Sequence, residues 1–70
     1  MHQINTADLP IGRRLKLERT VAGVSLTRVA NAVGVSIGQL SRIESGQRTA
    51  SAELIERIRV AVRAAGENAA

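Results

Sequence analysis

Apolar residues recur along the chain at the three- and four-residue spacing of amphipathic helices, in four segments separated by glycine or polar residues. The clearest set is Leu26, Val29, Ala30 and Val33. The pattern predicts helices over residues 9–22, 26–33, 37–45 and 52–65. No segment shows the strict alternation of a strand, so the sequence predicts an all-α fold.

Capping residues at the beginnings and ends of the predicted helices agree with these boundaries. Serine precedes three of the helices, at Ser25, Ser36 and Ser51, where its hydroxyl can accept a hydrogen bond from the first turn. Asp8 is expected to cap the first helix, and Ser36 with Gln39 has the spacing of a capping box. Glycine follows the first three helices, which suits the left-handed residue that ends a helix.

Charged residues on the first and fourth helices receive simple interpretations. Glu18 lies beside apolar positions, where an apolar residue would be expected. Glu53 and Arg57 are spaced for an ion pair on the solvated side of the fourth helix. Arg57 and Arg59 are otherwise expected to be solvated surface charges.

The chain has 70 residues and no cysteine, which indicates one small domain without a disulfide framework. Residues 1–7 lack periodicity and are expected to form a mobile arm, and residues 66–70 are expected to fray. Residues 8–65 would then form the folded domain. The first residues do not resemble a signal peptide, and the apolar stretches are too short to cross a bilayer. We therefore expect a cytoplasmic protein.

The formal net charge is +4, and nine of the ten basic residues are arginine. Arginine suits phosphates and guanine edges better than lysine does. The chain has no Phe, Trp or Tyr, which disfavours the modules that stack unpaired bases on aromatic rings. The composition therefore disfavours binding of single strands and RNA loops, and a net charge of +4 by itself is equally compatible with a soluble surface that happens to be basic.

The segment over residues 25–46 predicts two short helices joined by a tight turn at Gly34. Such a turn leaves the beginning of the second helix exposed, as in DNA-binding proteins that insert a helix into the major groove. The segment therefore indicates a helix-turn-helix.

The sequence resembles the phage repressor and Cro type of helix-turn-helix domain (XRE-like), which includes bacterial regulators and antitoxins. The resemblance spans residues 11–62. Its residues are Ile11, Gly12, Arg14, Arg19, Gly23, Ser25, Val29, Ala30, Gly34, Val35, Ser36, Leu40, Ser41, Ile43, Glu44, Gly46 and Ser51. The resemblance implies a compact lambda-repressor-like bundle of four or five helices. It also implies a sequence-specific transcription regulator, most often a repressor, that binds double-stranded DNA as a homodimer.

The resemblance implies that the third helix reads the bases. The matching positions are Ile37, Gly38, Gln39 and Arg42. Gln39 can pair with adenine, Arg42 can pair with guanine, and Ile37 can contact a thymine methyl group. Gly38 is either an approach point for the DNA backbone or a harmless glycine in a first turn.

Other residues are expected to contact the DNA backbone, which orients a domain without selecting sequence. They are Ser25, Ser36, Gln47, Arg48, Thr49, Arg13, Arg14 and Arg28. For the two serines, a purely capping role is the simpler interpretation. Arg19 and Glu44 match a structural ion pair that joins the first and third helices in relatives.

Two alternatives to a DNA-binding regulator are a protein-interaction module, such as an antitoxin or a self-associating helical adaptor, and an enzyme. The apolar residues Leu17 and Val21, or the wide apolar face of the fourth helix, could bind a protein. An enzyme is disfavoured because the single histidine lies apart and the carboxylates are scattered. We expect no catalytic residue, metal, cofactor or small-molecule ligand.

Overall fold

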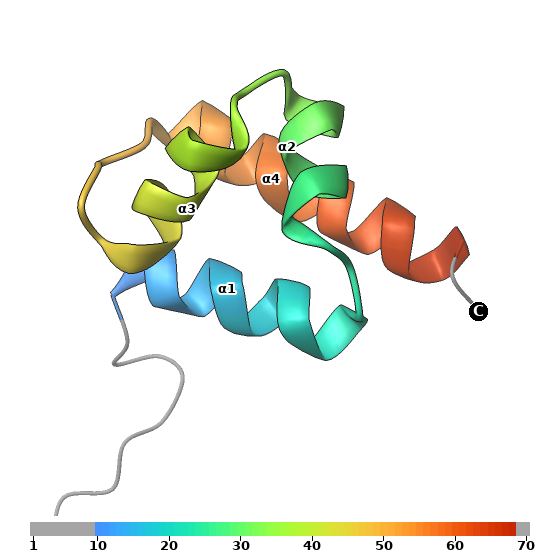
Figure 1. Cartoon of the computed structure of the whole chain (residues 1–70). Helices are drawn as coiled ribbons and strands as arrows, with labels where there is room; N and C mark the ends of the chain where they lie inside the picture. The colour runs from blue at the N-terminus through green and yellow to red at the C-terminus, as the bar shows by residue number, and fades with distance from the viewer. Residues whose placement is uncertain (1–9, 69–70) are drawn as a thin grey trace, which may run out of the picture.

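Four helices follow one another over residues 10–68, which are the residues that the computed structural model describes (Figure 1). They are α1 (Ile11–Ala22), α2 (Leu26–Val33), α3 (Ile37–Ser45) and α4 (Ala52–Asn68). The described range contains neither a strand nor a fifth helix. The predicted all-α fold class is therefore confirmed.

The bounds of α2 and α3 agree with the sequence pattern because local signals fix both ends. The Ser25 hydroxyl accepts a hydrogen bond from the Arg28 N–H at 3.1 Å, and the Ser36 hydroxyl accepts one from the Gln39 N–H at 3.0 Å. Between the helices, Gly34 has a φ of 78°, a left-handed conformation that glycine adopts without steric cost. Serine and glycine together define the turn between the two helices.

The outer bounds of the bundle differ from the prediction. Helix α1 begins at Ile11 and not at residue 9, after Pro10, which makes no side-chain capping bond. Asp8 and the expected mobile arm, residues 1–7, lie outside the described residues. Helix α4 continues to Asn68, three residues beyond the end that the sequence pattern predicts at residue 65.

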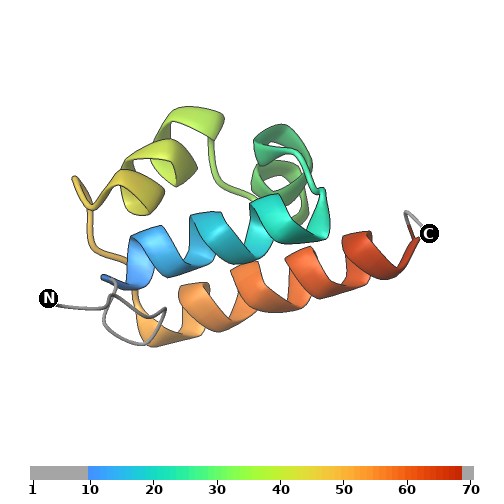
Figure 2. The same cartoon turned by 90° about the horizontal axis from the view of Figure 1, so that it is seen from below.

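Packing against α1 explains why α4 continues through Gly66. A β-carbon at position 66 would lie 3.4 Å from the β-carbon of Ala22, so the two helix ends touch at small residues. Helices α1 and α4 lie side by side and run in the same direction (Figure 2). The neighbouring helix thus supports the last turns of α4, where the local sequence alone predicts an end.

The core consists only of aliphatic side chains. Its buried members are Leu15, Val24, Val29, Ala30, Val33, Leu40, Ile43, Ile58, Val62 and Ala65. All four helices contribute to it, and α2 and α3 cross the pair formed by α1 and α4 (Figures 1 and 2). Burial of this apolar surface stabilises α2 and α3, which are too short to be stable helices alone.

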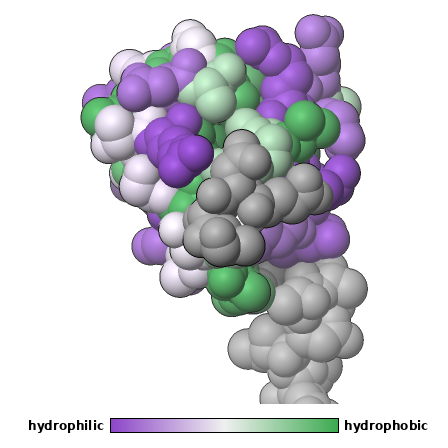
Figure 3. Space-filling model, turned by 90° about the vertical axis from the view of Figure 1, so that its right-hand side faces the viewer, coloured by the Kyte–Doolittle hydropathy of each residue, from purple (hydrophilic) through white to green (hydrophobic). Residues whose placement is uncertain are grey.

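Several apolar side chains remain outside this core. Val21 is 79% exposed, Val60 is 50% exposed and Leu17 is 39% exposed. Apolar patches lie among hydrophilic side chains at the end of the molecule where α1 and α4 finish (Figure 3). No helix within residues 10–68 is long and apolar enough to cross a membrane.

Candidate nucleic-acid interface

Helix α3 lies at the surface with its first turn exposed. Leu40 and Ile43 face the core, whereas Ile37, Gly38 and Arg42 lie on the opposite, exposed side. Ile37 is 46% exposed although it is large and apolar. The structure therefore brings three of the four expected base-reading residues onto one accessible face.

Gln39 lies at the edge of this face and is half-buried. Its backbone N–H donates to the Ser36 hydroxyl, but its side-chain oxygen does not accept in return from the Ser36 N–H. The expected capping box is thus formed in one direction only. The Gln39 side-chain amide is not committed to the cap.

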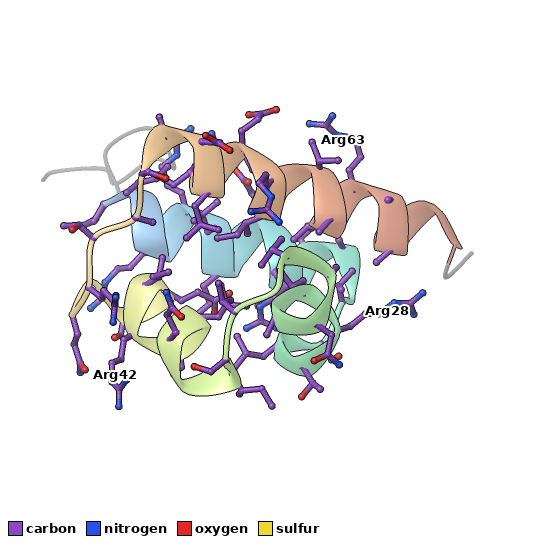
Figure 4. All side chains as sticks on the ribbon, turned by 90° about the horizontal axis from the view of Figure 1, so that it is seen from above. Arg28, Arg42 and Arg63 are labelled. Atoms are coloured by element: carbon purple, nitrogen blue, oxygen red, sulfur yellow. The ribbon has the colours of Figure 1, made fainter. Side chains whose placement is uncertain are left out.

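Gly38 and Arg42 are one turn apart and leave an open surface between them. A β-carbon at Gly38 would meet only the Arg42 Nη1 atom, 4.0 Å away. This distance is ordinary van der Waals contact, so packing within the chain does not require glycine here. Figure 4 shows the Arg42 side chain extending away from the helices.

The Arg19–Glu44 ion pair joins α1 to α3. The Arg19 Nε donates to one carboxylate oxygen of Glu44 at 2.8 Å, and Nη2 donates to the other at 3.0 Å. Nη1 donates to the Val24 carbonyl at 2.9 Å. One guanidinium group therefore holds α3 and the chain segment that leads into α2.

Burial makes this ion pair a structural element. Glu44 is only 4% exposed and is the one charged residue that is buried between residues 10 and 66. The hydrogen bond to Glu44 raises the pKa of Arg19 above its usual value, while burial opposes this increase. The charged pair fixes α3 against α1 and leaves the exposed face of α3 free.

A second contact between α1 and α3 requires glycine. Gly12 is buried, and a β-carbon there would collide with the carbonyl oxygen of Ile43. The backbones of the two helices approach closely at this point because position 12 has no side chain. Gly12 and Arg19 thus hold α3 at two places along α1.

The segment after α3 is attached to the end of that helix. The Arg42 carbonyl accepts hydrogen bonds from the N–H groups of Gln47 and Arg48, at 2.9 and 3.2 Å. The side chains of Gln47, Arg48 and Thr49 are exposed. These expected backbone-contacting residues therefore directly follow α3.

The other expected backbone-contacting residues are spread over the surface. Ser25 and Ser36 are exposed at the beginnings of α2 and α3, and Arg28 is exposed on α2. Arg28 and Arg42 extend from the side of the molecule formed by α2 and α3 (Figure 4). Arg13 is exposed on α1.

Arg14 lies apart from α3. It borders a polar groove between α1 and α4, together with Arg59 and Arg63. Arg63 extends from the side of the molecule opposite Arg42 (Figure 4). The structure therefore does not bring Arg14 together with α3.

Two arginines of α4 have structural contacts that the sequence analysis missed. The Arg57 Nη2 donates to the Val33 carbonyl at the end of α2, at 3.0 Å, and forms no ion pair with Glu53. Arg59 pairs with Glu18 of α1 through bonds of 3.0 and 3.3 Å. The interpretation of both arginines as merely solvated is wrong. The position of Glu18 beside apolar residues was the sequence feature that could have indicated its contact with Arg59.

A family model described as a helix-turn-helix domain matches residues 10–70, which is most of the chain. The chain belongs to this helix-turn-helix family. No curated protein and no solved structure matches the chain. The family match makes the domain a DNA-binding unit. In a helix-turn-helix the second helix is the one that enters the major groove, and α3 holds that position here.

The helix-turn-helix domain contains no cluster of three or more His, Cys, Asp or Glu residues that could hold a metal ion within the described range. Its exposed arginines can instead donate paired hydrogen bonds to phosphates and base edges.

Proposed function

We propose that the chain is a sequence-specific transcription regulator of the phage repressor and Cro type. It reads double-stranded DNA with α3 in the major groove. Ile37, Gly38, Gln39 and Arg42 contact bases, and Arg48 leads the contacts to the DNA backbone. The observation that carries the proposal is the exposed first turn of α3 on a helix that Arg19 and Gly12 hold against α1.

Repression is the regulatory outcome that we assign, because a domain bound across a promoter excludes other proteins from the same DNA. The regulator acts in the cytoplasm, where it reaches its operator, and it needs neither a cofactor nor catalysis. A reporter gene with the selected site inside its promoter tests this assignment. Expression should fall when the chain is produced, and a rise would contradict repression.

The direct test is selection of bound sites from random double-stranded DNA. Recovery of one recurring sequence supports sequence-specific reading, and a two-fold repeat about 34–36 Å apart between centres supports binding as a homodimer. Recovery of unrelated sequences would contradict the proposal.

A protein-interaction role is the second candidate, because α4 leaves Val60 half exposed beside an apolar groove. A salt titration separates the two functions. DNA affinity should fall by about 0.9 log units per log unit of salt for each phosphate contact. Apolar protein association should not show this dependence.

A further inference from the structure

The backbone carbonyl at the end of α2 is bonded from another helix. Val33 is the last residue of α2, and the last four carbonyls of a helix have no partner within that helix. The Nη2 atom of Arg57, on α4, donates to the Val33 carbonyl at 3.0 Å. A guanidinium group from α4 thus satisfies a backbone acceptor that α2 itself leaves open.

The positive charge of Arg57 suits this end of α2. A helix carries partial negative charge at its C-terminal end, where a cation is favourable. Helix α2 has no basic residue in its own last turn, so α4 supplies the cation that α2 lacks. A hydrogen bond from a charged donor is also stronger than one between neutral groups. The contact therefore stabilises the end of a helix of only eight residues, which is too short to be stable alone.

Val33 is also the point at which the chain leaves α2 toward α3. Gly34 follows with a φ of 78°, and α3 begins at Ile37. The N–H groups of Gly34 and Val35 both donate to the Ala30 carbonyl, at 3.0 and 3.1 Å. The connection is short and its hydrogen bonds hold it in one conformation. A displacement of Val33 is therefore passed on to the first turn of α3.

The contacts of α3 with α1 lie at the other end of α3. Gly12 and Arg19 reach α3 in its last turn, at Ile43 and Glu44. At about 1.5 Å per residue, these positions are about 10 Å along the helix from its beginning. The first turn, which carries the proposed base contacts, depends instead on core packing and on the connection that follows Val33.

Arg57 is not placed to touch DNA itself. It lines an apolar groove between α2 and α4 together with Glu53 and Glu56, whose carboxylates repel phosphates. None of the residues proposed to contact DNA lines this groove. The position of Arg57 therefore favours an indirect role in DNA binding.

We propose that Arg57 is a positioning residue for DNA reading. By holding the Val33 carbonyl, it keeps the first turn of α3 in the orientation that fits the major groove. The proposal rests on the proposed function and adds to it a residue that touches neither base nor phosphate. Without this bond, the folded domain samples other orientations of that turn, and only a fraction of the molecules is competent to bind the cognate site.

The direct test is Arg57→Met, which removes the donor and the charge but keeps an unbranched apolar stem. Binding to the cognate site should weaken about fivefold, the factor by which the competent fraction falls. Binding to random duplexes should change little, because phosphate contacts do not depend on the reading orientation. An unchanged ratio of cognate to random affinity would overturn the proposal.

The salt dependence of the same variant separates positioning from direct contact. The slope of log affinity against log salt should equal that of the wild-type chain, because no phosphate contact is lost. A slope smaller by about 0.9 would make Arg57 a contact to the DNA backbone and would contradict the positioning role.

The matched control is Arg59→Met. Arg59 is on the same helix and bonds Glu18 of α1 at 3.0 and 3.3 Å, so its loss weakens the bundle without touching α2. Its ratio of cognate to random affinity should equal that of the wild-type chain, and a loss as large as that of Arg57→Met would contradict the proposal. Arg57→Lys keeps a charged donor and should recover part of the cognate affinity. A lysine variant no better than the methionine variant would contradict a role for the charged bond.

Amide hydrogen exchange without DNA separates this proposal from the proposed function. The N–H groups of Gly34 and Val35 should exchange faster in Arg57→Met than in Arg59→Met, because only the first variant releases the end of α2. Faster exchange there, with no DNA binding by the wild-type chain, would leave the Arg57 contact standing and contradict the regulator. Cognate binding by the wild-type chain, with equal exchange in both variants, would contradict the positioning role alone.

Discussion

Arg42 is the long donor side chain on the open face of α3. It is exposed, and its guanidinium group lies near the position that a β-carbon on Gly38 would occupy. Its five N–H donors in a planar fork can pair with two acceptors on the edge of one guanine. We therefore assign most of the base discrimination of α3 to this side chain.

Replacing Arg42 with alanine should reduce discrimination between the cognate site and random DNA by about 1–3 kcal/mol. The fold should be unchanged, because the Arg42 side chain has no partner within residues 10–68 and only its carbonyl is bonded. Competition binding against random duplexes measures the loss, and thermal unfolding serves as the control. An unchanged ratio of affinities would remove Arg42 from the reading role.

Gly38→Ala should have opposite effects on stability and on binding. A β-carbon fits without collision at position 38 and alanine favours helix, so the free energy of unfolding should rise by up to about 1 kcal/mol. DNA affinity should fall if the DNA approaches the backbone here. Urea unfolding followed by circular dichroism and a binding titration give the two values. A variant that is more stable and binds equally well would identify Gly38 as a harmless glycine.

Single-residue roles were predictable where they depend on neighbours in sequence. The Ser25 and Ser36 caps act over three residues, so the sequence contains both partners within one turn. The bond from Arg57 to the Val33 carbonyl joins residues 24 positions apart. The four-residue spacing favours an ion pair of Arg57 with Glu53. Only the tertiary fold places the Arg57 guanidinium group beside the Val33 carbonyl at the end of α2.

At the scale of elements, α1 acts as a support for α3. Arg19→Ala should lower the free energy of unfolding by about 3–5 kcal/mol, because it leaves the Glu44 carboxylate buried and unpaired. Urea unfolding followed by circular dichroism measures this change, and it suits a chain without aromatic residues.

The control for this prediction is the double variant Arg19→Met and Glu44→Leu, which replaces the pair by apolar side chains of similar size. It should recover most of the lost stability, because neither charge is then buried alone. A double variant as unstable as Arg19→Ala would mean that the Val24 contact of Arg19, and not the charge of Glu44, carries the effect.

Element boundaries were predictable for α2 and α3 because serine and glycine mark both ends of each. The end of α4 was not, since its last turns are stabilised by contact with α1 and not by a capping residue. Gly66 favours a helix end when only neighbouring residues are considered. Beside Ala22 it instead allows the two helices to touch.

At the scale of the whole molecule, arginines are distributed over several surfaces, and only some lie near α3. Arg48 follows α3 and is exposed, whereas Arg59 is engaged with Glu18. Net charge alone therefore overstates how many arginines are available to one duplex. The sequence predicted an arginine-rich surface for DNA, and the fold determined which arginines lie together on that surface.

Arg48→Ala should weaken binding to cognate and random DNA by similar factors, since a phosphate contact carries no sequence information. It should also reduce the slope of log affinity against log salt by about 1. Titrations at several salt concentrations measure both quantities. A loss confined to the cognate site would instead make Arg48 a base-reading residue.

The raised pKa of Arg19 determines how the contact between α1 and α3 responds to alkaline solution. The pKa of Arg19 is raised by Glu44, so the contribution of the arginine charge is complete below the unfolded-state value and disappears only in more strongly alkaline solution than an ordinary arginine would need. A histidine in the same place would release its proton near neutrality. The attachment of α3 to α1 through Arg19 and Glu44 is thus insensitive to any alkaline pH that a living cell encounters.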